Sequence, residues 1–380
     1  MRRTSMWPIK SSPRSNASAT ETLSITITAH PTLHFRVAAG AGSMAFEADD
    51  FDLPVRDYDF TDISAADAGE VSGLLDAMAT AGGFSATKLA CARDILRDMF
   101  AALDDAGDKE GYKHLNWLSF PASLCATGTR GFFVEALKRN RFNVVVTTCG
   151  TLDHDIARTH AEYYHGSFEL DDVKLGEQGL NRLGNVIVPN SSYGETIEEV
   201  MLPMLAEIEE ERRVESPEDP WRGFGSVELC WAIGDRIEDE ASLLHHAARR
   251  RIPLVIPGIY DGAVGAQLFM HRQRSSDFRL DLLADQQILS DLVWTADASH
   301  ALIVGGGISK HHVIWWNQYR GGLDSAVQIS TAPEHDGSLS GARLREAVSW
   351  GKVRPEAPQV VVEGDASVLL PLLGVDLFRD

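Results

Sequence analysis

The stretch ALIVGGGISKHHVIWW, residues 301–316, indicates how this chain folds. A short apolar run ends on three glycines, and a segment with helical spacing begins directly after them. Successive glycines allow a ligand to approach the backbone closely, and the first turn of a helix offers free N–H groups. The stretch matches neither GxGxxG nor the Walker loop, so it carries no standard nucleotide fingerprint.

The chain around this stretch alternates short apolar runs with helical patterns. This alternation predicts an α/β fold with a mostly parallel, doubly wound, Rossmann-like sheet that has helices on both faces. Ligands bind such sheets at the carboxyl ends of the strands, near the switch in strand order. The predicted strands are residues 114–120, 142–148, 252–256, 278–283, 300–304, 325–329 and 359–362. The predicted helices are residues 66–80, 86–105 (capped by Ser85), 128–139, 195–212, 242–251 and 308–320.

Residues 1–43 differ in composition from the rest of the chain. They contain five Lys or Arg residues, one Glu and many Ser and Thr residues, without helical periodicity. We expect them to form a disordered tail, with Met44 as an alternative start, and residues 44–380 to form a single domain.

Composition restricts the classes of function. The formal net charge of -20 argues against nucleic acid as the main partner, because duplex binding needs clustered Lys and Arg, and it suits a protein that handles cations. The four cysteines have no CxxC spacing and no export signal precedes them, which predicts neither a disulfide framework nor a metal site. The apolar runs are too short to span a membrane. We therefore expect a soluble, cytoplasmic protein.

Two predicted strand ends carry polar side chains with two interpretations each. Thr148-Cys149-Gly150 is followed by Asp153 and His154, and the segment is either a ligand loop or a plain turn with Asp153 as helix cap. After the strand at 252–256, Asp261 is placed either to accept a hydrogen bond from a ribose hydroxyl or to stabilise a turn.

Two further segments could carry catalysis. His311 and His312 point about 100° apart on a helix, which disfavours joint metal binding and leaves one candidate base. Glu346 and Trp350 lie four residues apart, and Gly351 would let Lys352 turn inward beside the indole. A partly desolvated lysine can act as an amine nucleophile and form an imine, whereas a surface lysine after a capping glycine is the ordinary alternative.

Six segments together resemble the deoxyhypusine synthase family, and in particular its archaeal branch. They occur in family order between about residues 71 and 373. They are TTCG with the following D-H-D (147–155), NRLGNVIVPN (181–190), YDGAVG (260–265), GGGISKHH (305–312), DGSLSGARLREAVSWGK (336–352) and GDAS (364–367).

This resemblance implies an NAD-dependent aminobutyl transferase that acts on spermidine or a related polyamine. In the family, the lysine of SWGK forms a butylimine, which passes to one lysine of the translation factor 5A precursor and is then reduced. The resemblance also implies a homotetramer with active sites shared across dimer interfaces, without nucleic acid or membrane as partner.

The resemblance assigns roles to individual residues. Lys352 would be the nucleophile, His311 the proton acceptor, and Glu346 and Trp350 the residues that hold the polyamine. Further amine contacts would come from Gly306, Gly337, Ser338, Leu339, Asp153 and His154. NAD contacts would come from Ser123, Thr148, Cys149, Gly150, Asp261, Thr331, Ala332, Asp336, Ser340, Asp365 and Ala366.

Several positions depart from the eukaryotic members of the family, which have mostly carboxylates or amides there. These positions are Ser123, His154, Ala266, Trp315, Gln328 and Leu339. Fewer side chains are therefore available to bind the amine. Two alternative functions follow: a homospermidine synthase that transfers the group to putrescine, and an enzyme that uses agmatine. A regulatory, non-catalytic subunit is a further alternative, although the SWGK lysine that such a partner would lose is present.

Overall fold

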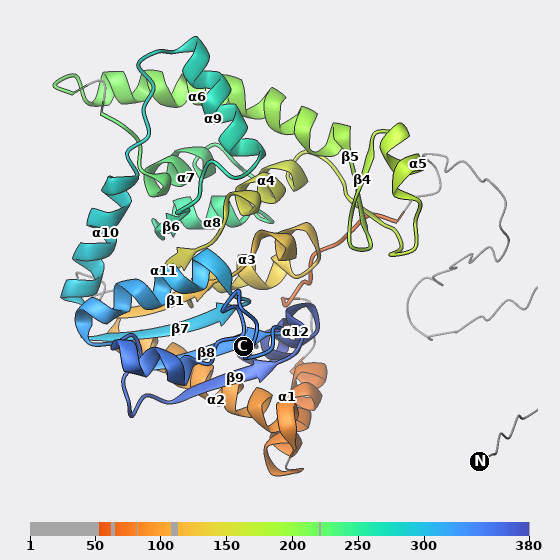
Figure 1. The fold of residues 1–380 in the computed structure, drawn as a ribbon, viewed down its shortest axis with the longest axis vertical. Helices are drawn as coiled ribbons and strands as arrows, with labels where there is room; N and C mark the ends of the chain where they lie inside the picture. Colours follow the sequence, from red (N-terminus) through yellow and green to blue (C-terminus); the bar gives the residue numbers. More distant parts are fainter. Residues whose placement is uncertain (1–52, 62–64, 82, 108–112, 220–221, 380) are drawn as a thin grey trace, which may run out of the picture. The chain divides into compact units, whose positions relative to one another are not determined.

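The computed structural model describes residues 53–61, 65–81, 83–107, 113–219 and 222–379. The expectations for residues 1–43 and for a start at Met44 lie outside these ranges. At the centre of the described part is a sheet of six parallel strands in the order β6-β2-β1-β7-β8-β9 (Figure 1). The strands are β1 (His114–Ser119), β2 (Val144–Val146), β6 (Leu254–Val255), β7 (Ala298–Val304), β8 (Ser325–Ser330) and β9 (Gln359–Glu363).

The strand order is that of a dinucleotide-binding sheet, in which the order reverses between the first and fourth strands. Here the reversal falls between β1 and β7, which pair in parallel along their whole length, for example Trp117 with Ala301. All six carboxyl ends lie at one edge of the sheet because every pair is parallel. The predicted fold class is therefore confirmed.

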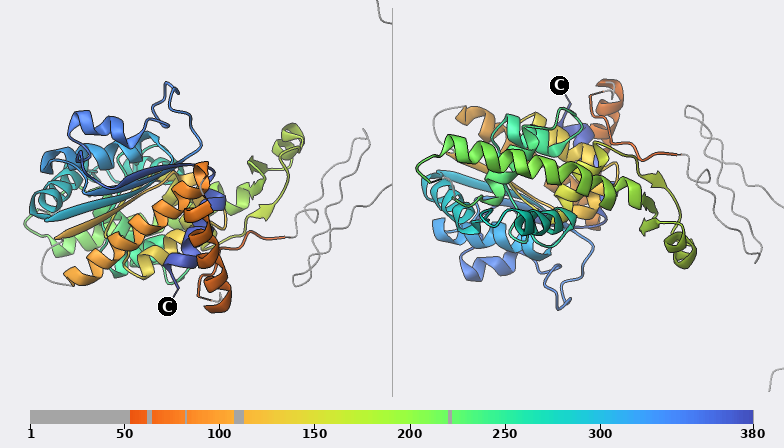
Figure 2. Two further views of the ribbon diagram at one scale, coloured as in Figure 1. Left: turned by 90° about the horizontal axis from the view of Figure 1, so that it is seen from below. Right: turned by 90° about the horizontal axis from the view of Figure 1, so that it is seen from above.

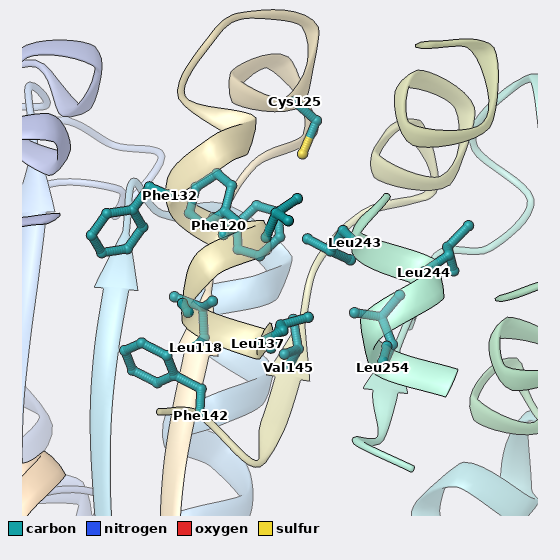
Figure 3. Close-up of a cluster of buried hydrophobic side chains, with 14 of the residues drawn as sticks. Leu118, Phe120, Cys125, Phe132, Leu137, Phe142, Val145, Leu243, Leu244 and Leu254 are labelled. Atoms are coloured by element: carbon teal, nitrogen blue, oxygen red, sulfur yellow. The ribbon is translucent and has the colours of Figure 1, made fainter. Parts of the chain in front are cut away.

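Helices cover both faces of this sheet (Figure 2). On one face, α10, α11 and the short 3-10 helix η5 pack on strand residues such as Leu115 and Trp117. On the other face, α2, α3 and α12 pack on Leu118 and Phe120, which point the opposite way because side chains alternate along a strand. Figure 3 shows part of this second layer, where the rings of Phe120 and Phe132 lie among buried leucines.

The helices occur both in the sheet connections and in a long insertion between β2 and β6. The α-helices are α1 (Ala65–Ala81), α2 (Phe84–Ala106), α3 (Arg130–Lys138), α4 (Cys149–Arg158), α5 (Asp172–Glu177), α6 (Gly194–Glu215), α7 (Ser226–Gly234), α8 (Leu243–Arg249), α9 (Ala263–Arg274), α10 (Leu282–Thr295), α11 (Gly307–Asn317) and α12 (Ala366–Leu377). The 3-10 helices are η2 (Ala122–Ala126), η3 (Asn190–Ser192), η4 (Gln318–Arg320) and η5 (Leu344–Trp350). Among the described helices, none combines the length and apolar composition that crossing a bilayer requires.

Two local predictions were wrong. Residues 278–283 are not a strand: Leu280 makes one isolated bridge with Phe224, and Asp281 caps α10 by accepting a hydrogen bond from the Leu283 N–H at 3.0 Å. Ser85 does not cap α2, which begins one residue earlier, after Gly83. The Gly83 N–H instead donates to Thr87 Oγ1 at 2.8 Å, so a residue inside the helix supplies the acceptor.

The insertion contains a second, antiparallel sheet that the alternation did not predict. Its strands, in the order β3-β5-β4, are β3 (Tyr164–His165), β4 (Leu180–Leu183) and β5 (Val186–Pro189). Gly184 and Asn185 form the two-residue turn between β4 and β5, with a left-handed φ of 64° at Gly184. Two-residue hairpin turns favour Gly and Asn, so this turn had a recognisable sequence signal.

A buried carboxylate connects two helices of the insertion with each other and with α3. Asp155 of α4 is 0% exposed, and it accepts hydrogen bonds from Ser242 Oγ at 2.7 Å and from the Leu243 and Leu244 N–H groups at 3.0 and 2.9 Å. Its oxygen also lies 3.5 Å from the buried guanidinium of Arg130. Asp155 therefore caps α8 from a helix far away in the sequence.

We expect Asp155→Ala to lower the free energy of unfolding by about 3–5 kcal/mol, because three donors would lose their acceptor and the buried guanidinium of Arg130 would keep only Asp57 as a carboxylate partner. Urea unfolding followed by circular dichroism measures this loss. The matched control is Asp239→Ala, which removes an exposed carboxylate that accepts from the Ala241 N–H. Equal losses in the two variants would contradict the structural role of Asp155.

Two histidines, the buried His154 and the half-buried His312, make stability depend on pH. Burial, reinforced by Arg158, lowers the pKa of His154 to about 4, and burial with the nearby His311 lowers the pKa of His312 to about 4. In the unfolded chain both titrate near 6.5. Between these values the unfolded state binds more protons than the folded state, so the free energy of unfolding falls as the pH falls from about 6.5 to 4.

We expect each histidine to contribute up to about 1.4 kcal/mol per pH unit in this window. Urea unfolding of the wild type and of His312→Leu between pH 7.5 and 5 tests this expectation, and the variant should show the shallower slope. Parallel slopes would mean that His312 titrates alike in both states.

Candidate active site

A pocket of about 600 Å³ lies between α11, η5 and the loop that precedes η5. Its lining includes six residues that the sequence marked as candidates. They are His311, Ser338, Leu339, Glu346, Trp350 and Lys352. Residues separated by more than forty positions in the chain therefore share one cavity on the α11 face of the sheet.

Lys352 enters this pocket because of the residue before it. η5 ends at Trp350, and Gly351 adopts a left-handed conformation with φ 66°, which turns the chain. The Lys352 N–H donates to the carbonyl of Ala347 at 3.0 Å, and the side chain is 9% exposed. The inward turn predicted from Gly351 is thus present.

Two indoles flank the amine of Lys352. Its Nζ lies 5.3 Å from the ring centroid of Trp350 and 5.6 Å from that of Trp315. Such ring faces attract cations, including protonated substrate amines. Trp350 is 67% exposed and Trp315 41% exposed, so they also form an apolar mouth to the pocket.

His311 stands on the same face of α11 as Trp315, four residues on, and their rings stack at 5.7 Å with an interplanar angle of 24°. Burial, and secondarily the charge of Lys352, lowers the pKa of His311. The imidazole is therefore neutral near pH 7 and able to accept a proton. His312 is not part of the pocket lining, so the two histidines diverge as their adjacency predicts.

Trp315 and Lys310 line the pocket but were not identified as site residues from the sequence. A signal existed for Trp315, since it follows His311 by four residues in a helix. Lys310 carried no such signal, because a lysine in a helix usually faces solvent. Here it is buried, and burial lowers its pKa to about 8.

The residues predicted to contact NAD lie in loops at the carboxyl edge of the sheet. Ser123 follows β1 within η2, Gly150 lies in the first turn of α4 after β2, and Asp261 follows β6. Thr331 and Ala332 follow β8, and Asp365 and Ala366 follow β9. Ser338 connects the other two predicted contacts: its N–H donates to Asp336, and its hydroxyl donates to Ser340.

Close backbone packing connects neighbouring loops of this edge. A Cβ on Gly306 would lie 2.5 Å from the Cα of Ser340, and one on Gly150 would lie 2.9 Å from the Cβ of Ala122. A Cβ on Gly305 would be 3.6 Å from Pro121, which places the glycine turn beside the loop after β1 at the strand-order reversal. Free helix N-termini and glycines at this reversal suit a dinucleotide phosphate.

Asp153 and His154 do not reach the pocket. The Asp153 carboxylate is buried, and it accepts hydrogen bonds from the Ala263 and Val264 N–H groups at 2.9 and 2.8 Å and from Tyr193 Oη at 2.8 Å. It caps α9 and not its own helix. His154 is buried with Nδ1 3.0 Å from Tyr163 Oη, and it is neutral at pH 7.

Asp365 likewise uses its carboxylate for capping, since it accepts a hydrogen bond from the Ser367 N–H at 2.8 Å. Cys149 is buried, and burial raises its pKa to about 12, so it is no nucleophile. In the ranges that the structure describes, no group of three or more His, Cys, Asp or Glu side chains is arranged to hold a metal ion.

Comparison with known proteins identifies the family. The model of the family described as deoxyhypusine synthase matches residues 73–376. A relative from Picrophilus torridus is 47% identical over 312 residues, which cover 82% of this chain and 94% of the relative. One from Sulfolobus acidocaldarius is 44% identical over 319 residues, covering 84% and 96%. Both are named "Probable deoxyhypusine synthase".

A crystal structure of an Entamoeba histolytica protein, described as "a putative deoxyhypusine synthase", has the same fold. The TM-score is 0.57 at 20% identity, and the match covers 85% of this chain and 96% of that one. The family match includes the whole six-stranded sheet and every residue of the Lys352 pocket. The chain therefore belongs to the deoxyhypusine synthase family.

Proposed function

We propose that this protein is an NAD-dependent transferase that moves the aminobutyl group of spermidine to one lysine of the translation factor 5A precursor. The observation that carries the proposal is the placement of Lys352, 9% exposed, with its amine between two indoles in a pocket that also contains His311 and Glu346. A buried amine in an aromatic, partly acidic pocket suits imine chemistry on a cationic substrate.

Each of these pocket residues has a separate role in the proposed reaction. Glu346 and the indoles of Trp315 and Trp350 hold the protonated polyamine. Neutral His311 accepts the proton of the secondary amine while the adjacent carbon is oxidised to an imine. Lys352 Nζ then attacks that carbon and diaminopropane leaves. The resulting butylimine on Lys352 passes to the acceptor lysine, where it is reduced and Lys352 is released.

NAD, when bound, would accept the hydride of the first step and return it in the last. The strand order, the glycines beside the order reversal and the free N-terminus of α11 fit this cofactor. Thr148, Asp261, Thr331 and Ala332 would contact it.

The proposal includes a homotetramer in which neighbouring copies complete each site. The row of predicted NAD contacts runs from the loop after β6 to the loop after β9, which spans five strand gaps or roughly 24 Å. Contacts so far apart are best explained as parts of two sites, each finished by a second copy. We further propose that residues 44–380 are the catalytic domain and that it works in the cytoplasm.

One observation favours a second candidate. Among the described residues that line the pocket, Glu346 is the only carboxylate. Positions 315 and 339 are Trp and Leu, so the pocket offers few anchors for a triamine. A homospermidine synthase with putrescine as acceptor, or an enzyme with agmatine as donor, would need fewer.

We expect Lys352→Ala to abolish transfer and to lose the borohydride-trapped adduct with labelled spermidine, because no amine remains to form the imine. NAD affinity should change less than about threefold, since the side chain lies outside the predicted cofactor loops. Mass spectrometry of the trapped adduct and NAD titration measure the two effects. The control is Lys113→Ala, an exposed lysine near Asp297. Full turnover by Lys352→Ala would exclude the covalent route.

One set of incubations with NAD identifies which amine donor and which acceptor the enzyme uses. Spermidine with the factor 5A precursor should give a modified lysine, detected as the aminobutyl mass increment. Spermidine with putrescine, and agmatine with the precursor, are the competing arms. Homospermidine as the only product would reject the factor as substrate, and no product in any arm would favour a regulatory subunit.

A further inference from the structure

The loop from Thr331 to Arg343, here called the mouth loop, brings Ser338 and Leu339 to the entrance of the Lys352 pocket. Its backbone conformation is not one that the loop residues favour by themselves. Leu339 has a left-handed φ of 60° although it is 61% exposed and therefore has little packing to hold it there. Hydrogen bonds within the loop, such as that from the Leu339 N–H to the Asp336 carbonyl at 3.0 Å, support this turn, and contacts from outside the loop fix its position against the pocket.

Gln328 supplies one such contact. It lies on β8 and is 0% exposed. Its Nε2 donates to the carbonyl oxygens of Ser340, at 3.0 Å, and of Gly305, at 3.2 Å. One amide group thus joins the mouth loop to the glycine turn after β7.

Lys310 supplies the second contact, from α11. It is 6% exposed, and its Nζ donates to the carbonyl oxygen of Ala342 at 2.7 Å. Glu346 stabilises its charge, although burial lowers the pKa of the amine to about 8. An interior lysine that reaches a main-chain carbonyl is uncommon, and its hydrogen bond replaces hydration that it has lost.

Tight backbone packing makes both contacts specific to one loop conformation. A Cβ on Gly341 would lie 2.1 Å from the carbonyl oxygen of Pro333, so the loop folds back on itself between the two contact points. Ser340 also packs closely against Gly306, as described above. Small movements of Ser340 or Ala342 would therefore break the hydrogen bonds and change the position of Leu339.

We propose that Gln328 and Lys310 are positioning residues that clasp the mouth loop and so set the width of the amine entrance. Neither needs to touch the substrate: Gln328 is closed off behind the loop, and Lys310 acts through Ala342. The effect on the amine rests on the proposed function, whereas the clasp itself concerns only the conformation of this chain. Gln328 would thus affect the site indirectly, through its hydrogen bonds to the main chain of two loops.

Hydrogen exchange of the full-length protein tests the clasp without reference to activity. In Gln328→Met, which keeps the volume but loses both amide donors, we expect the peptide covering residues 334–343 to exchange roughly five- to tenfold faster. Lys310→Met should accelerate the same peptide, and Lys310→Arg, which retains a donor, should restore slower exchange. The β7 peptide should be unchanged in all three variants.

Gln287→Met is the matched control, because Gln287 lies on α10 and donates only to the Asp291 side chain among the described residues. Wild-type exchange of the mouth loop in both Gln328→Met and Lys310→Met would overturn the clasp. Faster exchange across the whole sheet would also overturn it, since it would show general destabilisation.

Steady-state kinetics then tests the consequence. We expect KM for spermidine to rise about five- to tenfold in Gln328→Met while kcat changes less than twofold, because the nucleophile and base remain in place. A fall in kcat at constant KM would contradict a role in the amine entrance. If the wild type turns over none of the proposed substrates, the proposed function fails, and the exchange data still decide the clasp.

Discussion

The parallel pairing of β1 with β7 is the constraint on which the rest of this structure depends. Because the two strands run in the same direction, the loops after Ser119 and Val304 leave the same edge, one on each side of the order reversal. The glycine turn occupies this position, and the α11 helix that follows crosses to the face where Lys352 is found. The loops that we propose to bind the cofactor and the Lys352 pocket are thereby placed next to each other by a single pair of strands.

Buried aspartates connect the elements that this sheet does not pair. Asp153 caps α9 and Asp155 caps α8, although both lie on α4, and Asp285 of α10 caps α7 through the Ser226 and Val227 N–H groups. In each case, a carboxylate satisfies N–H groups that a helix start leaves without intrahelical partners. The acidic composition of the chain thus contributes to its interior as well as to its surface.

The pocket combines the amine of Lys352 with little formal negative charge. Trp315 and Trp350 present ring faces to Lys352, and Glu346 supplies a carboxylate at the wall. Attraction to aromatic faces is less dependent on exact geometry than an ion pair, so such a pocket could attract the proposed cationic substrate with few carboxylates. Under the proposed function, these ring faces would compensate for the amide and the carboxylate that the family resemblance implies for eukaryotic members at positions 315 and 339.

The sequence alone determined the alternation of strands and helices, the inward turn at Gly351 and the divergence of His311 and His312. These features follow from local periodicity and from the backbone freedom of glycine, and both can be recognised from residues that are close together in the chain. It also identified six of the fifteen residues that line the pocket, all of which fall within one segment of about fifty positions.

Only the tertiary structure decided which polar side chains face the pocket and which support the fold. Asp153 and His154 follow a predicted ligand loop, yet their partners are Ala263, Tyr193 and Tyr163, which no local pattern connects to them. Lys310 and Gln328 are buried because the mouth loop folds over them. Residues distant in the chain determine these burials, so the role of such a side chain depends on contacts that exist only after the sheet has formed.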